Sequence, residues 1–350
     1  MRINGTAHRS IALCADGWAV EVIDQRQLPW RLEITELRSA AMVLRAIREM
    51  WVRGAPLIGA TAAYGLCLGL REDASDQSLQ RHYQLLLDAR PTAVNLQWAL
   101  RRVREAAAPH QGQQRIEAAY ASAAAICEED VRNNQRIGEH GLKLIRAFAR
   151  RERAVNVLTH CNAGALATVD FGTALAPIYR AHEAGIAVHV WVDETRPRNQ
   201  GALLTAYELS QQGIAHTVIA DNAGGLLMQQ GRVDLCLVGA DRVARNGDVC
   251  NKIGTYLKAL AAHDNRVPFY VALPFSTFDA SLASGADIVI EERAAAEVTE
   301  IQGQGAGGEL ATVRLTESVA ANPAFDITPA RLVRGYVTEK GVLERLDSAA

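Results

Sequence analysis

The segment 158-LTHCNAGALAT-168 places a histidine, a cysteine and an asparagine next to one another, directly after a short apolar run. A cysteine at the start of a helix feels the positive end of the helix dipole. We therefore expect a lowered pKa for Cys161 and a role in hydrogen bonding or proton transfer. The alternative for Cys161 is a small, inert core residue. For His160 a hydrogen-bonded structural role is the preferred interpretation, because adjacent residues need not face the same way.

A carboxyl group comes after another apolar run at Asp241, in the segment VDLCLVGADR. A carboxyl held in a dry pocket has a raised pKa and can then serve as a general acid near neutral pH. Asp241 could equally cap the next segment or pair with Arg242. On the residues alone, the chemical and the structural interpretation of Asp241 both stay open.

Three places combine a polar side chain with a predicted helix start, an arrangement that binds phosphate. The residues 53-RGA-55 precede Pro56, which is well suited to the first position of a helix. Arg90 stands before Pro91 and repeats the device. Asn251 and Lys252 precede a further predicted helix and suit a phosphate or a hydroxyl group. Each arginine or lysine could instead be an ordinary surface residue.

Composition limits the classes of ligand. The chain has 350 residues and a formal net charge of −2, so it has no overall attraction for nucleic acid or an anionic membrane. Its apolar stretches fall short of the roughly 18–20 residues of a membrane span, and its N-terminus lacks a signal core, so we expect a cytoplasmic protein. The six cysteines lie far apart without a C-x-x-C pair, which predicts free thiols and no metal site.

Hydrophobic periodicity predicts two kinds of structure along the chain. The first thirty residues alternate like strands, and apolar residues then recur every three or four positions, which is typical of helices. The helices are expected at 37–51, 56–70, 77–88, 93–107 and 114–149. We therefore expect an N-terminal mixed α+β, mostly helical domain over residues 1–130.

Short, continuously apolar runs separated by helical stretches characterise residues 131–350. Such runs mark strands buried on both faces, so this part is predicted to be a Rossmann-like, doubly wound parallel sheet, which makes the whole chain α/β. Ligands bind beyond the carboxyl ends of the strands of such sheets. Cys161, Gln200 and Asp241 come after three of the runs. The runs occupy 155–158, 187–192, 215–220, 233–238, 269–273 and 287–290.

One apparent motif is rejected. Residues 303-GQGAGG-308 fit the G-x-G-x-x-G pattern of dinucleotide sites, but they neither come after a buried strand nor open an amphipathic helix. A flexible loop is the better interpretation. This argues against a nicotinamide-dependent dehydrogenase, the activity that the sheet alone would suggest.

Together these segments resemble the 5-methylthioribose-1-phosphate isomerase family, which is similar in fold to regulatory subunits of a translation initiation guanine-nucleotide exchange factor. The resemblance runs in order from about Ile23 to the C-terminus and includes RGAPLIGATAAYGL, RPTAVNLQWAL, LTHCNAGALAT, ETRPRNQGALLTAYEL, GADRVARNGDVCNKIGTY and NPAFDITPARLVRGYVTEKG. It implies a homodimer without metal or nucleotide cofactor, with Asp241 as proton donor and Cys161 as its partner. The implied substrate contacts are Arg53, Gly54, Ala55, Arg90, Gln200, Asn251 and Lys252.

The implied reaction is the conversion of 5-methylthioribose 1-phosphate to 5-methylthioribulose 1-phosphate in methionine salvage. The chain departs from the family pattern at residues 303–321, which leaves open an isomerase of a 5-deoxyribose or another ribose 1-phosphate. A non-catalytic sugar-phosphate or nucleotide-sensing subunit on the same fold is the other alternative. Such a subunit would not need both Cys161 and Asp241, so their joint presence favours an enzyme.

Overall fold

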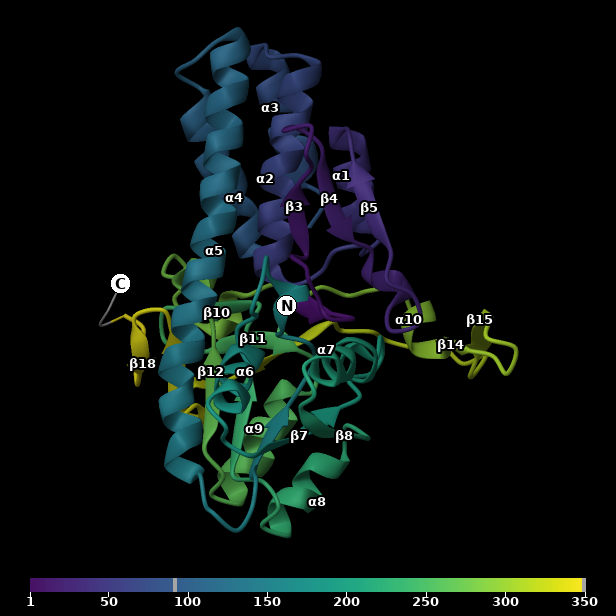
Figure 1. Ribbon diagram of the computed structural model, residues 1–350, viewed down its shortest axis with the longest axis vertical. Helices are drawn as coiled ribbons and strands as arrows, with labels where there is room; N and C mark the ends of the chain where they lie inside the picture. The colour runs from purple at the N-terminus through teal and green to yellow at the C-terminus, as the bar shows by residue number, and fades with distance from the viewer. Residues whose placement is uncertain (91–92, 348–350) are drawn as a thin grey trace.

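The computed structural model describes residues 1–90 and 93–347. A helical part carries the N-terminus, and a part built around a sheet carries most of the remaining chain (Figure 1). The 37-residue helix α5 (Gly112–Phe148) runs along both parts and packs on the sheet strand β17.

The N-terminal part contains the short strands and the helices expected from periodicity. Ser39 and Ser75 cap two of the helices by accepting hydrogen bonds from backbone N–H groups of the first turn. The strands are β1 (Arg2–Ile3), β2 (Thr6–Ala7), β3 (Ile11–Leu13), β4 (Val20–Ile23) and β5 (Ile34–Leu37). The helices before α5 are α1 (Ala40–Arg48), α2 (Ala55–Glu72), α3 (Asp76–Leu87) and α4 (Val94–Ala107).

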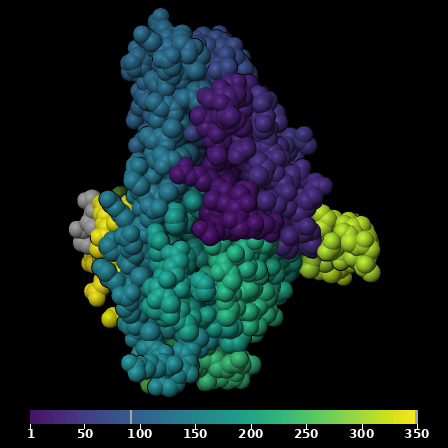
Figure 2. Space-filling model, in the orientation of Figure 1, coloured from purple at the N-terminus to yellow at the C-terminus, as the bar shows by residue number. Residues whose placement is uncertain are grey.

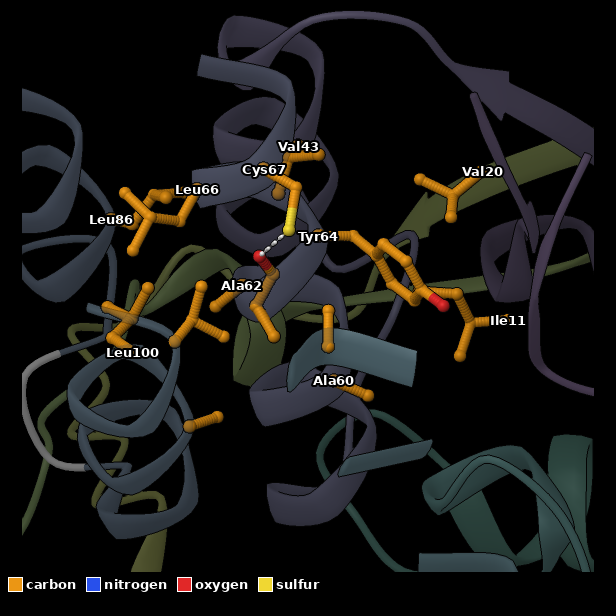
Figure 3. Close-up of a cluster of buried hydrophobic side chains, with 14 of the residues drawn as sticks. Ile11, Val20, Val43, Ala60, Ala62, Tyr64, Leu66, Cys67, Leu86 and Leu100 are labelled. Atoms are coloured by element: carbon orange, nitrogen blue, oxygen red, sulfur yellow. Dashed lines mark hydrogen bonds between the residues drawn. The ribbon is translucent and has the colours of Figure 1, made fainter. Parts of the chain in front are cut away.

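Helix α2 is the centre of the N-terminal core. Fifteen of its 18 residues are buried, because strands pack on one side of it and helices on the others. Figure 3 shows Ile11 and Val20 of the strands on one side of this helix, and Leu86 and Leu100 of the neighbouring helices on the other. The thiol of Cys67 donates to the carbonyl of Ala63 at 3.2 Å, which satisfies it inside the helix. A helix held on every side gives its N-terminus, at Gly54 and Ala55, a fixed position.

The C-terminal part confirms the Rossmann-like, doubly wound class. Its sheet has the strand order β18-β17-β12-β9-β6-β7-β8, and all neighbours pair in parallel except β17 and β18. The six parallel strands have the dinucleotide-fold order 3-2-1-4-5-6 when counted along the chain. The strands are β6 (Val155–Thr159), β7 (Val188–Asp193), β8 (Ala215–Ile219), β9 (Leu235–Val238), β12 (Phe269–Ala272), β17 (Gly335–Thr338) and β18 (Gly341–Leu343).

Both faces of this sheet are covered. Val157 packs into a core shared with α5 and α6, while the next residue, Leu158, packs into a core shared with α8 and α9. This alternation explains why the strand sequences are continuously apolar. The helices after α5 are α6 (Leu175–Glu183), α7 (Ala206–Gln211), α8 (Ala223–Gln229) and α9 (Thr255–Asp264).

The strand order reverses between β6 and β9, which are neighbours in the sheet. Ligands of open α/β sheets bind at this reversal, beyond the carboxyl ends of the strands. Cys161 comes just after β6 and Asp241 just after β9. The fold thus brings the two expected reactive side chains to one edge of the sheet.

Two expectations about strands were wrong. Residues 287–290 form no strand, because Ser284 caps a 3-10 turn at Gly285–Asp287 and Val289 is 75% exposed. The sixth parallel strand of the sheet is instead β17, which lies between β12 and the antiparallel edge strand β18, and whose glycine start hid it from the apolar pattern. The run at 215–220 does form β8, but this strand is an exposed edge and is not buried on both faces.

A second sheet and a projecting hairpin complete the C-terminal part. The second sheet has the order β13-β10-β11-β16 and contains β13 (Phe278–Asp279), β10 (Arg242–Ala244), β11 (Val249–Lys252) and β16 (Phe325–Thr328). The glycine-rich residues 303–308 lie in the hairpin of β14 (Glu300–Gln304) and β15 (Leu310–Arg314), and they open no helix. This hairpin comes after the short helix α10 (Ala296–Thr299) and stands away from the body in Figures 1 and 2.

The division at residue 130 stays a prediction. Helix α5 passes through residue 130 without a break. Val131, just after the expected division, still packs into the N-terminal core, and Ile137 packs into the C-terminal core. Among the described helices, none combines the length and the apolar character needed to cross a membrane.

Candidate active site

One cavity lies beyond the carboxyl ends of the parallel strands and below the N-terminus of α2. All nine site residues expected from the sequence line it, although they come from five separate segments of the chain. They are Arg53, Gly54, Ala55, Arg90, Cys161, Gln200, Asp241, Asn251 and Lys252.

Asp241 lies three residues after the end of β9, and its backbone N–H donates to the carbonyl of Cys250 at 2.9 Å. Loss of hydration raises the pKa of its carboxyl, and the positive charges of Lys252 and Arg293 oppose this rise. Its neighbour Arg242 forms an ion pair with Asp279, with 3.6 Å between the nearest nitrogen and oxygen. A carboxyl with a raised pKa holds its proton more readily near neutral pH, as a general acid requires.

The expectation that Cys161 has a lowered pKa was wrong. Cys161 does not start a helix: it lies in a turn with a left-handed backbone (φ 64°), and only a three-residue 3-10 turn comes after it, at Ala165–Ala167. Loss of hydration raises the pKa of its thiol, although the positive charges of Arg53 and Lys252 act against this rise. Cys161 therefore lines the cavity as a neutral thiol, able to donate a hydrogen bond.

The residues before α2 line the cavity at the corner where anion binding was expected from the sequence. Gly54 has φ +91°, and a Cβ there would overlap the backbone of Ala167, so only glycine fits. Ala55 then opens an 18-residue helix. Pro56 has no N–H, and within the described residues the N–H groups of Ala55 and Leu57 have no partner, so they can bind an anion. The Arg53 guanidinium donates to the side-chain oxygen of Asn162 at 2.7 Å and to its carbonyl at 2.9 and 3.2 Å.

Asn251 and Lys252 lie on β11 and line the same cavity, and α9 begins just after Gly254. The Lys252 amine donates to the carbonyl of Ala324 at 2.9 Å and lies 4.5 Å from the centre of the Phe325 ring. Burial lowers the pKa of Lys252 to about 8, and the positive charge of Arg293 acts in the same direction. Lys252 is therefore a buried cation and not a solvated surface lysine.

Several buried polar atoms of the cavity lack a hydrogen-bond partner within the described residues. They are the Nε atoms of Arg53 and Arg90 and the side-chain oxygen of Gln200, whose residue is 6% exposed. Arg90 also pairs with Glu291 at 3.1 Å. Helix α4 begins at Val94, and Pro91, which was expected to open it, lies outside the described residues. Buried donors and acceptors without partners are costly, so they mark groups that a polar ligand would satisfy.

Sequence reasoning missed Arg293, which also lines the cavity. It pairs with Glu291 at 2.9 Å and lies 5.5 Å from the centre of the Phe325 ring. The apolar run 287–290 ends three residues before it. Cys161 and Asp241 stand at the same distance after the runs that end at 158 and 238, and this position is the signal in the sequence for Arg293.

His160 has the structural role that was preferred for it. Its Nδ1 lies 2.8 Å from a carboxylate oxygen of Asp193, and its Nε2 lies 2.8 Å from the carbonyl oxygen of Ile253. His160, Asp193 and Asp221 could hold a metal ion by geometry, since their ligand atoms lie within 4.8 Å of one another. The amine of Lys258, however, lies 3.2 Å from the same Asp193 oxygen, and this positive charge opposes a bound cation.

Comparisons with known proteins agree with this arrangement. A model of the initiation factor 2 subunit family matches residues 51–345. The chain is 61% identical over 346 residues to the methylthioribose-1-phosphate isomerase of Acidiphilium cryptum (strain JF-5), an alignment that covers 98% of this chain and 94% of the relative.

Two solved structures are similar to it as well. The 5-methylthioribose 1-phosphate isomerase from Pyrococcus horikoshii OT3 has a TM-score of 0.82 and 38% identity, covering 96% of this chain and 92% of that chain. The translation initiation factor eIF-2B, subunit delta, from A. fulgidus has a TM-score of 0.77 and 39% identity, covering 96% of each chain. On this evidence the chain belongs to the initiation factor 2 subunit family, among its methylthioribose-1-phosphate isomerases.

Proposed function

We propose that this chain is an isomerase that converts 5-methylthioribose 1-phosphate to 5-methylthioribulose 1-phosphate, the aldose-to-ketose step of methionine salvage. One observation carries the proposal: a carboxyl with a raised pKa, Asp241, and a neutral thiol, Cys161, line the same cavity as an anion-binding helix start. The names of the relatives supply the substrate.

The phosphate group would bind at the start of α2. The backbone N–H groups after Gly54 and the guanidinium of Arg53 point positive charge toward this corner. Arg90, Asn251 and Lys252 line the same cavity. The side-chain oxygen of Gln200, which has no partner in the described part of the chain, would accept from a substrate hydroxyl. These groups would fix the sugar relative to the reacting pair.

The chemistry begins with ring opening, because an aldose 1-phosphate has no free aldehyde. Asp241 would donate its proton to the ring oxygen as the bond between that oxygen and carbon 1 breaks. Hydrogen then moves from carbon 2 to carbon 1, and the hydroxyl on carbon 2 gives up a proton as carbon 2 becomes a carbonyl. Cys161 would stabilise the developing charge or relay that proton, and the ionised Asp241 can take it back.

The chain would act as a cytoplasmic homodimer without a metal ion or nucleotide. Its charge of −2 gives it no general attraction for nucleic acid. Exposed apolar side chains near the projecting hairpin, at Val313, Leu315 and Val319, are consistent with contact between two copies of the chain.

Incubation of the purified protein with candidate ribose 1-phosphates, with NMR detection of a new ketone, tests the proposal. Methylthioribose 1-phosphate should give the highest kcat/KM. If only another 5-substituted ribose 1-phosphate is turned over, the proposed substrate is wrong and that compound is the substrate. If the protein binds these compounds but turns none of them over, it is a sensing subunit and not an enzyme.

A further inference from the structure

Glu208 is a buried carboxylate that the proposed reaction does not use. It lies on α7, is 2% exposed, and accepts hydrogen bonds from four neutral donors. They are the side-chain amide of Asn162 (2.7 Å), the hydroxyl of Tyr179 (2.8 Å) and the backbone N–H groups of Ala165 (2.7 Å) and Leu166 (3.2 Å). Within the described residues no basic side chain forms an ion pair with it.

Asn162 joins this carboxylate to the anion-binding corner. Its side-chain nitrogen donates to Glu208, and its side-chain oxygen accepts from the Arg53 guanidinium at 2.7 Å. The amide of Asn162 can have only one orientation, because reversing it would face its NH₂ group to the guanidinium and its oxygen to the carboxylate. Glu208 therefore fixes the orientation of the Asn162 amide in which its side-chain oxygen faces Arg53.

The same carboxylate holds the loop that carries Cys161. A Cβ on Gly164 would overlap both Glu208 carboxylate oxygens, so this glycine permits the close approach. The hydroxyl of Thr205, one turn before Glu208, donates to the carbonyl of Cys161 at 2.7 Å. The hydroxyl of Thr195 accepts from the Cys161 N–H at 2.8 Å. These contacts fix the left-handed backbone of Cys161 from both sides.

An unusual backbone presents these groups. The turn η3 (Gly201–Thr205) is a π-helix that leads directly into α7, and such insertions concentrate at functional sites. Gln200 stands at its start, and its side-chain oxygen has no hydrogen-bond partner among the residues that the structure describes. Thr205 and Glu208 share a helix face three residues apart. The segment QGALLTAYEL thus serves the site through more than its glutamine.

We propose that Glu208 is a positioning residue of the reaction. Through Asn162 it orients the guanidinium of Arg53, and through the loop amides it orients the thiol of Cys161. Its negative charge also favours the ionised guanidinium, which loses hydration in the cavity. The proposal rests on the proposed function for its main assay, and a binding assay keeps the two separable.

The test compares Glu208→Gln with the matched variant Asp130→Asn. Asp130 holds the far end of the same loop by accepting from the Val169 N–H at 2.8 Å, a contact that does not involve Arg53. Both variants replace a buried acid by its amide, and the urea midpoint of unfolding measures how far each change alters the stability of the fold. Glu208→Gln should lower kcat/KM about 10- to 100-fold, as loss of a partner that orients a binding group does at other sites. Asp130→Asn should stay within about threefold of the unmodified protein, the spread we allow for independent sites.

A double-mutant cycle separates positioning from general loosening of the fold. If Glu208 acts largely through Arg53, Glu208→Gln should cost far less in an Arg53→Lys background than alone. The same fold-loss in both backgrounds would overturn the proposal, as would unchanged kcat/KM in Glu208→Gln. Should Glu208→Gln not fold, Asn162→Ala breaks the same link, and its unchanged kcat/KM would equally overturn the proposal.

Binding of inorganic phosphate, measured by calorimetry, covers the case in which no ribose 1-phosphate is turned over. That result would contradict the proposed function but would leave the proposed role of Glu208 in orienting Arg53 open to test. Weaker phosphate binding by Glu208→Gln than by Asp130→Asn would still support the role of Glu208. Equal affinities would overturn it.

Discussion

Replacing Lys252 by methionine should make the protein more stable near neutral pH while removing most of its activity. Burial lowers the pKa of Lys252 from 10.5 to about 8. Each tenfold change in proton affinity corresponds to about 1.36 kcal/mol, so keeping the charged amine in the folded protein costs about 3 kcal/mol at pH 7. Methionine removes that cost but leaves the carbonyl of Ala324 without its donor, a loss of about 1–2 kcal/mol. The expected net gain is about 1–2 kcal/mol.

The gain should depend on pH in one direction. Between pH 8 and 10.5 the unfolded chain keeps a proton on this lysine that the folded protein has lost, so the stability contributed by Lys252 rises with pH across this window. Lys252→Met lacks that rise. Its advantage at pH 7 should therefore shrink and vanish by about pH 10, whereas kcat/KM should be lower about 10- to 100-fold, as expected for a lost charge-assisted hydrogen bond.

Urea unfolding of both proteins at pH 7 and pH 10 measures this difference, since other titrating groups are common to both. Lys258→Met is the control, because Lys258 is equally buried but pairs with Asp193 at 3.2 Å. Its removal leaves the buried Asp193 carboxylate with its His160 contact but without the lysine charge, and should destabilise the protein by about 3–5 kcal/mol. A Lys252→Met protein less stable than the unmodified one at pH 7, or with an advantage unchanged at pH 10, would refute the reasoning.

Three further changes have defined outcomes. Asp241→Asn should retain the fold but lower kcat by at least about 100-fold, as loss of a general acid does, and retained turnover would exclude Asp241 as the acid. In the unmodified protein, kcat/KM should fall as rising pH removes the Asp241 proton. Cys161 should react slowly with iodoacetamide at pH 7 and faster as pH rises toward its raised pKa, and inorganic phosphate should slow the reaction; fast alkylation at pH 7 would contradict a neutral thiol. Gly54→Ala should destabilise the protein by about 1–3 kcal/mol, because φ +91° and the backbone of Ala167 leave no room for a Cβ. Calorimetry should also find weaker phosphate binding, and unchanged stability and affinity would contradict a phosphate site at the start of α2.

The helices and most strands could be predicted because their physical cause is local. The continuous apolar run at 233–238 reports a strand buried on both faces, and Leu237 and Val238 do pack into opposite cores. The rule that ligands bind beyond the carboxyl ends of parallel strands then pointed to Cys161 and Asp241, and applying it did not require the strand order. That the two strands are neighbours depends on pairing between distant segments, which local periodicity does not contain.

The errors arose where tertiary contacts outweigh local pattern. The pKa argument for Cys161 assumed a helix dipole, but the thiol lies in a turn held by Thr195 and Thr205, and loss of hydration dominates. Val289 made 287–290 resemble a buried strand, yet it is exposed. Glu208 offered no signal of its own, because its partners lie more than 25 residues away in sequence.

A crystal structure of Asp241→Asn with methylthioribose 1-phosphate bound tests the central claim most directly, since the slowed variant should retain the substrate. We expect the phosphate on the N–H groups that open α2 and on Arg53, with the ring oxygen within hydrogen-bond distance of the side chain at position 241 and the Cys161 sulfur facing carbons 1 and 2. The account would be contradicted by a sugar bound outside this cavity. It would also be contradicted by a ring oxygen that faces solvent, with residue 241 and Cys161 in separate cavities.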